Sequence, residues 1–159
     1  MKWLVFSDSH GHWEYMKRAV EKEQPDRVLH LGDVTRDAQR LLKECPGLTL
    51  EQVRGNCDGF IDDYPEEKEL FFGTKRVWML HGHTYRVKLG IGMLTSEARA
   101  RGMDVVLFGH THEPVCFLEG TLWVMNPGAI GGMAAQPTYG VIEERKGELY
   151  CRIEVLSKG

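Results

Sequence analysis

The stretch Lys2–Gly11, KWLVFSDSHG, decides the fold because an apolar run stops abruptly at a cluster of polar residues. The run at residues 3–6 is typical of a buried strand. Residues 11–24 then place their apolar side chains at helical spacing with charges between them, and residues 27–31, RVLHL, form a second buried run. This strand–helix–strand order predicts a parallel sheet built by right-handed crossovers.

The same alternation continues at first and then changes. Residues 36–45 predict a short helix and residues 48–55, LTLEQVRG, a third strand. Beyond Asp58 the pattern predicts, in order, a hairpin around Gly73-Thr74 within residues 68–82, a helix over residues 93–102, a buried strand over residues 104–110, and antiparallel hairpins over residues 115–126 and 139–156.

The last strand is expected to be half buried, because four apolar residues alternate there with polar ones. These residues are Leu149, Cys151, Ile153 and Val155. The sequence shows no internal repeat or linker, so we expect one α/β domain over residues 1–159 with two sheets.

Composition excludes some classes of function. The 159 residues are 42% hydrophobic and 27% charged, which is ordinary for a globular protein, and the formal net charge is −3. The pI is about 6.2. No basic patch is indicated, so we expect no stable nucleic-acid binding.

A cytoplasmic location is expected. The apolar run at residues 3–6 is too short for a signal peptide, and no stretch is long enough to span a bilayer. The four cysteines form no C-x-x-C pair, so a disulfide framework is not expected.

Five short polar clusters follow the expected strands. They are SDSHG after Phe6, GD after Leu31, GNCD after Arg54, HGH beginning at His81 and GHTH after Phe108. In open α/β sheets, ligands bind outside the carboxyl ends of the strands. The five clusters are therefore expected to line one cleft.

The residue types in these clusters suit a metal site. Asp8 and His10 lie two apart, as do the two histidines of HGH and the two of GHTH. In an extended segment such pairs would point to one side and chelate together. Asp, Asn and His are ligands for Mn, Fe, Zn or Mg rather than for thiophilic metals.

Each cluster alone has an ordinary structural interpretation. Asp8 and His10 fit a helix cap followed by a surface histidine, GD fits a turn, and GNCD fits a left-handed turn. GHTH is the strongest single indication of metal binding. All five clusters, each at a strand end, favour the metal site.

The clusters DSHG, GD, GNCD, HGH and GHTH, in this order, resemble the calcineurin-like metallophosphoesterase superfamily, and its small prokaryotic phosphodiesterase branch in particular. The resemblance extends from Asp8 to the NPGA at Asn126–Ala129. It implies two mixed β-sheets packed face to face with helices on the outside, a four-layer αββα sandwich. It also implies hydrolysis of a phosphodiester by a hydroxide that a dinuclear metal centre activates.

The resemblance assigns the metal ligands residue by residue. Asp8, His10 and His112 would hold one ion, Asn56, His81 and His110 would hold the other, and Asp33 would bridge both. The cofactors would be two divalent cations, with Mn²⁺ as the first choice and Fe²⁺, Ni²⁺, Mg²⁺ and Zn²⁺ as alternatives.

Catalytic and substrate roles are expected for a smaller set. Asp33, Asn56 and His83 are the catalytic candidates, and Asn56, Cys57 and His83 are the candidates for contact with the substrate. His83 would contact the substrate phosphate or support His81; otherwise it is a loop residue.

Cys57 stands where many superfamily members have a histidine that is thought to protonate the leaving oxygen. A thiol with a pKa of about 8.5 replaces imidazole poorly at neutral pH. A nucleophilic thiol would need an activating base beside it. A nucleophile and a metal ligand are the alternatives, but a packed or weakly acidic cleft residue is the favoured interpretation.

Three other features have structural interpretations. His12 is expected to be solvated or to cap a helix, and His30 to be a packed strand histidine unless it orients Asp33 from behind. The NPGA segment is expected to shape the cleft wall through a turn at Pro127 and Gly128.

Two other functions are compatible with the same fold. The retromer-subunit branch uses it as a protein-binding scaffold after losing part of the metal set, and a phosphomonoesterase would use the same centre. Every ligand position is filled here, which favours the enzyme acting on a small phosphodiester. Apolar Trp, Phe and Met residues leave a homo-oligomer open.

Overall fold

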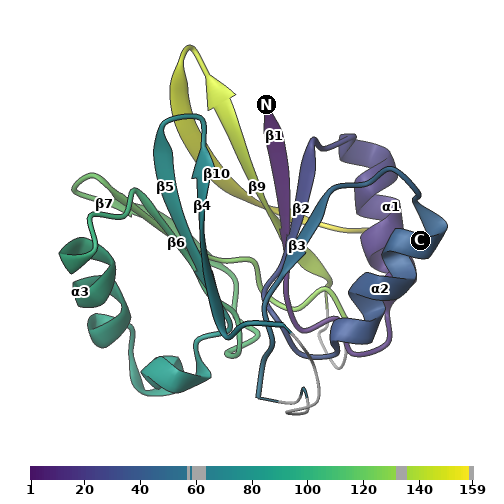
Figure 1. Cartoon of the computed structure of the whole chain (residues 1–159), viewed down its shortest axis with the longest axis horizontal. Coiled ribbons are helices and arrows are strands. Elements are labelled where there is room, and N and C mark those ends of the chain that lie inside the picture. The colour runs from purple at the N-terminus through teal and green to yellow at the C-terminus, as the bar shows by residue number, and fades with distance from the viewer. Residues whose placement is uncertain (57, 59–63, 132–135, 158–159) are drawn as a thin grey trace.

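Two five-stranded sheets pack face to face in the computed structural model of the chain, as Figure 1 shows. The structure describes residues 1–56, 58, 64–131 and 136–157. In spatial order, the first sheet consists of β10 (Glu148–Val155), β9 (Thr138–Arg145), β1 (Lys2–Phe6), β2 (Arg27–His30) and β3 (Leu50–Gln52). The second consists of β4 (Glu67–Phe72), β5 (Lys75–Leu80), β6 (Val105–Leu107), β8 (Leu122–Asn126) and β7 (Val115–Glu119).

Both sheets are mixed. In the first sheet β1, β2 and β3 run parallel, with Leu4 opposite Val28, which confirms the parallel pairing expected from the sequence. The later strand β9 pairs antiparallel with β1, with Leu4 opposite Val141. In the second sheet β5, β6 and β8 are parallel, and the hairpin partners β4 and β7 are antiparallel.

Helices cover the outer faces of the two sheets. In Figure 1, α1 (Trp13–Glu23) and α2 (Thr35–Glu44) lie outside the first sheet, and α3 (Gly92–Ala100) lies outside the second. The short 3₁₀ turns η1 (His83–Tyr85) and η2 (Val87–Leu89) connect β5 to α3. The expected four-layer αββα sandwich is confirmed.

The alternation of side chains along the strands builds three layers of core. In β1, Trp3 and Val5 join the core between the sheets, whereas Leu4 and Phe6 face α1 and α2. The same division occurs in β5, where alternate residues face the other sheet or α3. An uninterrupted apolar run is thus the pattern expected of a strand covered on both faces.

Three expectations about strands differ from the structure, one being the strand expected over residues 104–110, which is limited to Val105–Leu107. The third strand is limited to Leu50–Gln52, although Val53 remains buried and its N–H donates to the His30 carbonyl. Val155 is 50% exposed, because it is the last paired residue of β10 and lies outside the core cluster that includes Cys151.

The arrangement of strands fixes where a site can form. The loops after β1, β2, β3, β5 and β6 gather at one end of the sandwich, at the bottom of Figure 1, while the β4–β5 and β9–β10 hairpin turns lie at the opposite end. Within the described part of the chain, no helix combines the length and apolar character needed to cross a membrane.

Candidate metal centre

Asp8 is the central acidic residue of the loop end. It is fully buried, and its Oδ2 accepts hydrogen bonds from the Ser7 hydroxyl at 2.6 Å and from the His110 backbone N–H at 3.2 Å. Its other oxygen, Oδ1, is buried without a hydrogen-bond partner among the described residues. A buried carboxylate oxygen left unsatisfied requires a compensating group, and a cation is the usual one.

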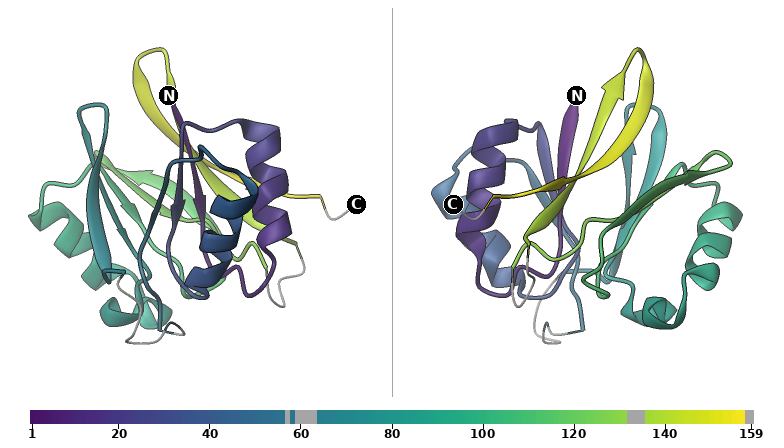
Figure 2. Two further views of the ribbon diagram at one scale, coloured as in Figure 1. Left: turned by 45° about the vertical axis from the view of Figure 1, so that its right-hand side comes forward. Right: turned by 180° about the vertical axis from the view of Figure 1, so that it is seen from behind.

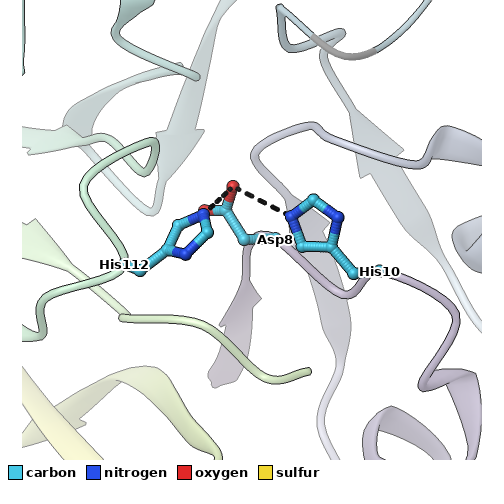
Figure 3. Close-up of side chains that lie close together, drawn as sticks. All are labelled: Asp8, His10 and His112. Carbon is cyan, nitrogen blue, oxygen red and sulfur yellow. Dashed lines mark ion pairs between the residues drawn. The ribbon is translucent and has the colours of Figure 1, made fainter. Parts of the chain in front are cut away.

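Three imidazole rings surround that oxygen. The Nε2 atoms of His112, His10 and His81 lie 3.2, 3.9 and 3.9 Å from Asp8 Oδ1. Figure 3 shows Asp8 between the rings of His10 and His112, which come from loops of different sheets. His10 Nε2 is itself buried and has no hydrogen-bond partner within the described residues.

His81 links this group to Asp33. Its Nε2 lies 3.4 Å from Asp33 Oδ2 and 3.2 Å from His110 Nδ1. Its Nδ1 lies 2.9 Å from the Leu31 carbonyl, which only accepts, so Nδ1 carries the proton. In the neutral ring the Nε2 lone pair is therefore free for a metal.

The electrostatics favour a positive charge at this point. Burial lowers the pKa of His81, but the hydrogen bond that its ring donates to the Asp33 carboxylate and the negative charges of Asp8 and Asp33 raise the pKa above its ordinary value overall. Burial, together with the charges of His81 and Lys88, lowers the pKa of His110 to about 4, so its ring is neutral at pH 7.

The spacing of these atoms fits metal coordination. Ligand atoms bound about 2.1 Å from one ion lie roughly 3.0–3.4 Å from each other. Two groups of side chains have atoms close enough to share an ion, namely Asp8 with His10 and His112, and Asp8 with Asp33 and His81. A divalent cation therefore fits the described residues, and both groups include Asp8.

The backbone at the candidate ligands is strained. Several of the non-glycine residues with positive φ belong to the proposed ligand set, namely Asp8 (54°), His10 (41°), Asp33 (64°), His110 (71°) and His112 (64°). Each such conformation costs about 1–3 kcal/mol and is typical of functional sites. The sequence-based expectation that Asp8 with His10, and His110 with His112, lie in extended segments is wrong. Left-handed backbone conformations direct these side chains instead.

Comparison with known proteins identifies the family. The model of the calcineurin-like phosphoesterase superfamily domain matches residues 1–147. The chain belongs to the calcineurin-like phosphoesterase superfamily. The probable metallophosphoesterase YsnB of Bacillus subtilis is 32% identical over 82% of this chain and 75% of its own. Phosphodiesterase MJ0936 of Methanocaldococcus jannaschii is 29% identical over 93% of this chain and 96% of its own.

Solved structures agree on the fold. A predicted phosphoesterase from Streptococcus pneumoniae is similar with a TM-score of 0.80 and 25% identity, covering 99% of this chain and 93% of its own. Vps29 of Chaetomium thermophilum has a TM-score of 0.78 at 21% identity, covering 99% and 90%. At that identity the likeness to Vps29 shows the fold alone.

Asp58 holds the Asp33 loop of this calcineurin-like phosphoesterase. Its Oδ2 accepts the backbone N–H groups of Asp33 (3.0 Å) and Gly55 (2.7 Å). Its Oδ1 accepts those of Val34 (2.8 Å) and Thr35 (3.0 Å). The sequence did not predict this role, because the backbone N–H groups that Asp58 accepts cannot be identified from the sequence.

We expect Asp58→Asn to weaken metal binding and hydrolysis by about 10–100-fold, the range typical of residues that orient ligands. An amide has one acceptor oxygen, and its NH₂ would face backbone donors. The metal dissociation constant and kcat should be measured beside Asp26→Asn, since Asp26 accepts the Lys2 N–H on an exposed surface. Equal metal affinity in the two variants would show that Asp58 does not orient the site.

A buried polar chain supports the Asp8–His10 loop. The Gly32 N–H donates to His30 Nδ1, so His30 Nε2 donates to Ser9 Oγ, 3.1 Å away. Ser9 in turn donates to Asp37, which also accepts the Gly11 N–H. Burial lowers the pKa of His30 to about 4, which keeps the ring neutral. The expected packed strand histidine therefore also positions the Asp8–His10 loop.

Asn126, the first residue of NPGA, fixes the GHTH loop. It is fully buried, and its amide donates to the Gly109 carbonyl (3.1 Å) and to Thr111 Oγ1 (2.8 Å). Its side-chain oxygen accepts the Gly128 N–H. The segment thus positions the loop that carries His110 and His112 rather than only shaping a wall.

The remaining candidates lie at the rim or outside the described residues. Asn56 is exposed in a turn closed by the Asp58 N–H on the Gly55 carbonyl, and its metal contact stays a prediction. The His83 ring centroid lies 5.5 Å from that of His81, and its Nδ1 is buried without a described partner. Cys57 lies outside the described residues.

His12 belongs to neither of the groups of described side chains that could hold a metal ion. It occupies the N-cap position of α1 without a side-chain capping hydrogen bond, and its ring stacks on Tyr15 at 4.9 Å. The expected capping role is therefore not fulfilled by the side chain.

Proposed function

We propose that the protein is a metal-dependent phosphodiesterase that hydrolyses a small phosphodiester. One observation carries the proposal most strongly, the buried Asp8 Oδ1 that three histidine Nε2 atoms surround. Membership of the phosphoesterase superfamily supports it, as does the likeness to proteins named phosphodiesterases.

The proposed centre is dinuclear. Asp8, His10 and His112 would hold one ion, and Asn56, His81 and His110 the other, with Asp33 between them. Two divalent cations, for which we propose Mn²⁺, would supply Lewis acidity for activating water and for stabilising charge on the phosphoryl oxygens. The short distance from His81 to both Asp33 and His110 supports this division.

The protein residues place these ligands before any substrate arrives. Three features hold the loops in one geometry. They are the left-handed turns at Asp8 and His10, the hydrogen bonds that Asp58 accepts from backbone N–H groups, and the hydrogen bonds that the Asn126 amide donates. Such preorganisation lowers the cost of reaching the transition state.

We propose that His83 and Asn56 contact the substrate phosphate. Burial, and then the charge of His81, lowers the pKa of His83, so the ring is neutral at pH 7 and one nitrogen donates a hydrogen bond. Its position at the start of η1, beside His81 and His110, supports contact with a group held at the centre.

Replacement of Cys57 tests the leaving-group step. We expect Cys57→Ala to change kcat/KM little with activated aryl diesters. Cys57→His should increase activity toward monoesters and poor leaving groups by up to about 10²–10⁴-fold, because imidazole donates a proton near pH 7. The measurement is kcat/KM over leaving groups of graded pKa. An inactive Cys57→Ala protein that retains both metals would instead place the thiol in the chemistry.

The substrate class is tested by comparing bis(p-nitrophenyl) phosphate with p-nitrophenyl phosphate, using protein loaded with Mn²⁺. We expect the diester to be hydrolysed at least about 10-fold faster, because the chain is similar to proteins named phosphodiesterases. Faster hydrolysis of the monoester would favour the phosphomonoesterase instead. Metal binding without turnover of either ester would favour the scaffold.

We also propose that residues 1–159 form a single metallophosphoesterase domain that acts in the cytoplasm. The family match ends at residue 147, yet β10 completes the first sheet by pairing with β9. The described cysteines Cys45, Cys116 and Cys151 are free thiols, which is typical of a reducing compartment.

A further inference from the structure

The four sheet edges differ in how they are protected from pairing with another strand. The edge strands are β3 and β10 in the first sheet and β4 and β7 in the second. Charged side chains on an edge discourage further pairing. β3 contains Glu51, β4 contains a charged run at residues 67–69, and β10 contains Glu148, Arg152 and Glu154. β7 has no charge from residue 115 to residue 118.

The unprotected edge of β7 is also exposed and apolar. The exposed fractions are 38% for Val115, 37% for Phe117 and 52% for Leu118. Among the described strands β7 pairs only with β8, so one side of its backbone presents free N–H and C=O groups. An extended strand with apolar side chains on both faces is the group that fits such an edge.

A groove of about 530 Å³ lies beside this edge and is lined by residues of β7 and β10. The ribbons of these two strands can be followed in Figure 2 (right). Leu118 and Cys116 form its β7 side, and Tyr150 and Arg152 belong to its β10 side. Side chains of a strand added to β7 would extend the inner face of the second sheet over this groove.

We propose that β7 pairs antiparallel with β7 of a second copy of the chain, around a two-fold axis, to form one continuous ten-stranded sheet. The edge is self-complementary. With Phe117 opposite Phe117 of the second copy, Cys116 faces Leu118 and Val115 faces Glu119, so no like charges are opposed. Arg99 already neutralises Glu119 at 3.0 Å.

A second copy is favoured over an unrelated strand because the chain itself contains an extended strand with apolar side chains on both faces. β7 is extended, apolar on both faces and at a free edge, and the same patch then serves both partners of an isologous dimer. His112 lies three residues before the first residue of β7, outside the paired strand, and the other end of the strand lies away from the centre, so pairing leaves both centres open.

The test is sedimentation equilibrium of the full chain between about 1 and 100 μM, a range that spans micromolar dissociation constants. Reductant should be present so that Cys116 cannot crosslink two copies. We expect a dimer in the wild type and a dissociation constant at least about 100-fold higher in Phe117→Lys and in Leu118→Lys, because each buries an unpaired charge.

The matched control is Phe71→Lys, which places the same charge on an apolar residue of the opposite edge strand, β4, where Phe71 is 65% exposed. It should dimerise like the wild type. Circular dichroism of each variant verifies folding, and Leu118→Lys, at the more exposed position, remains informative if Phe117→Lys unfolds. A wild type that stays monomeric throughout, or a folded Leu118→Lys variant that dimerises like the wild type, overturns the proposal.

Discussion

Asp33→Asn is expected to abolish phosphodiester hydrolysis and to lose at least one bound cation per chain. We expect kcat to fall by at least about 10³-fold, because metal activation of water contributes several kcal/mol to catalysis. Asparagine has nearly the same shape but is neutral and offers one acceptor oxygen, so it cannot bridge two ions through two carboxylate oxygens. Asp33 Oδ1 also lies against the backbone of Gly55: a Cβ added to Gly55 would lie 2.2 Å from it. Residue 55 therefore has no room for a side chain larger than that of glycine.

Elemental analysis and turnover of an aryl diester should be measured on the same preparation of the Asp33→Asn variant. Asp104→Asn is the matched control, since Asp104 accepts the Arg76 N–H at the opposite end of β6. The control should keep its metal and its activity. Two bound ions with near-native turnover in the Asp33→Asn protein would disprove the bridging assignment.

His110→Ala and His112→Ala should both be severely impaired, by at least about 100-fold, while the fold remains intact. His112 Nε2 lies beside Asp8, whereas His110 Nδ1 lies beside His81, so each substitution would remove a ligand from a different ion. The rings sit in a loop beyond the end of β6, so no core packing is lost.

The two histidine variants should be assayed at limiting metal, because excess metal can hide a weakened site by mass action. His12→Ala serves as the control, as His12 lies near the same loop end but stacks on Tyr15. A variant that retains full activity at limiting metal would show that its histidine is not a ligand.

The sequence predicted the parallel strands and the hairpins, because local patterns determine them. The apolar run of β1, covered on both faces, and the polar clusters at the strand ends indicated the parallel strands and the position of the site. The antiparallel pairing of β9 with β1 depends on a contact between opposite ends of the chain, which periodicity does not reveal.

The site was harder to predict at the level of backbone. Spacing grouped His110 with His112, yet the left-handed conformation of both residues directs one ring toward His81 and the other toward Asp8. The role of Asp58 depends on four backbone N–H groups, and backbone donors leave no mark in a sequence.

The most direct test of the central claim is a titration of activity against bound metal. Protein stripped with a chelator should receive Mn²⁺ in known amounts, and bound metal and aryl-diester turnover should be measured in each sample. We expect turnover to be absent in the stripped protein and to rise until two ions are bound per chain. Full turnover in the stripped protein, or a maximum reached with one ion per chain, would contradict a dinuclear metal-dependent phosphodiesterase.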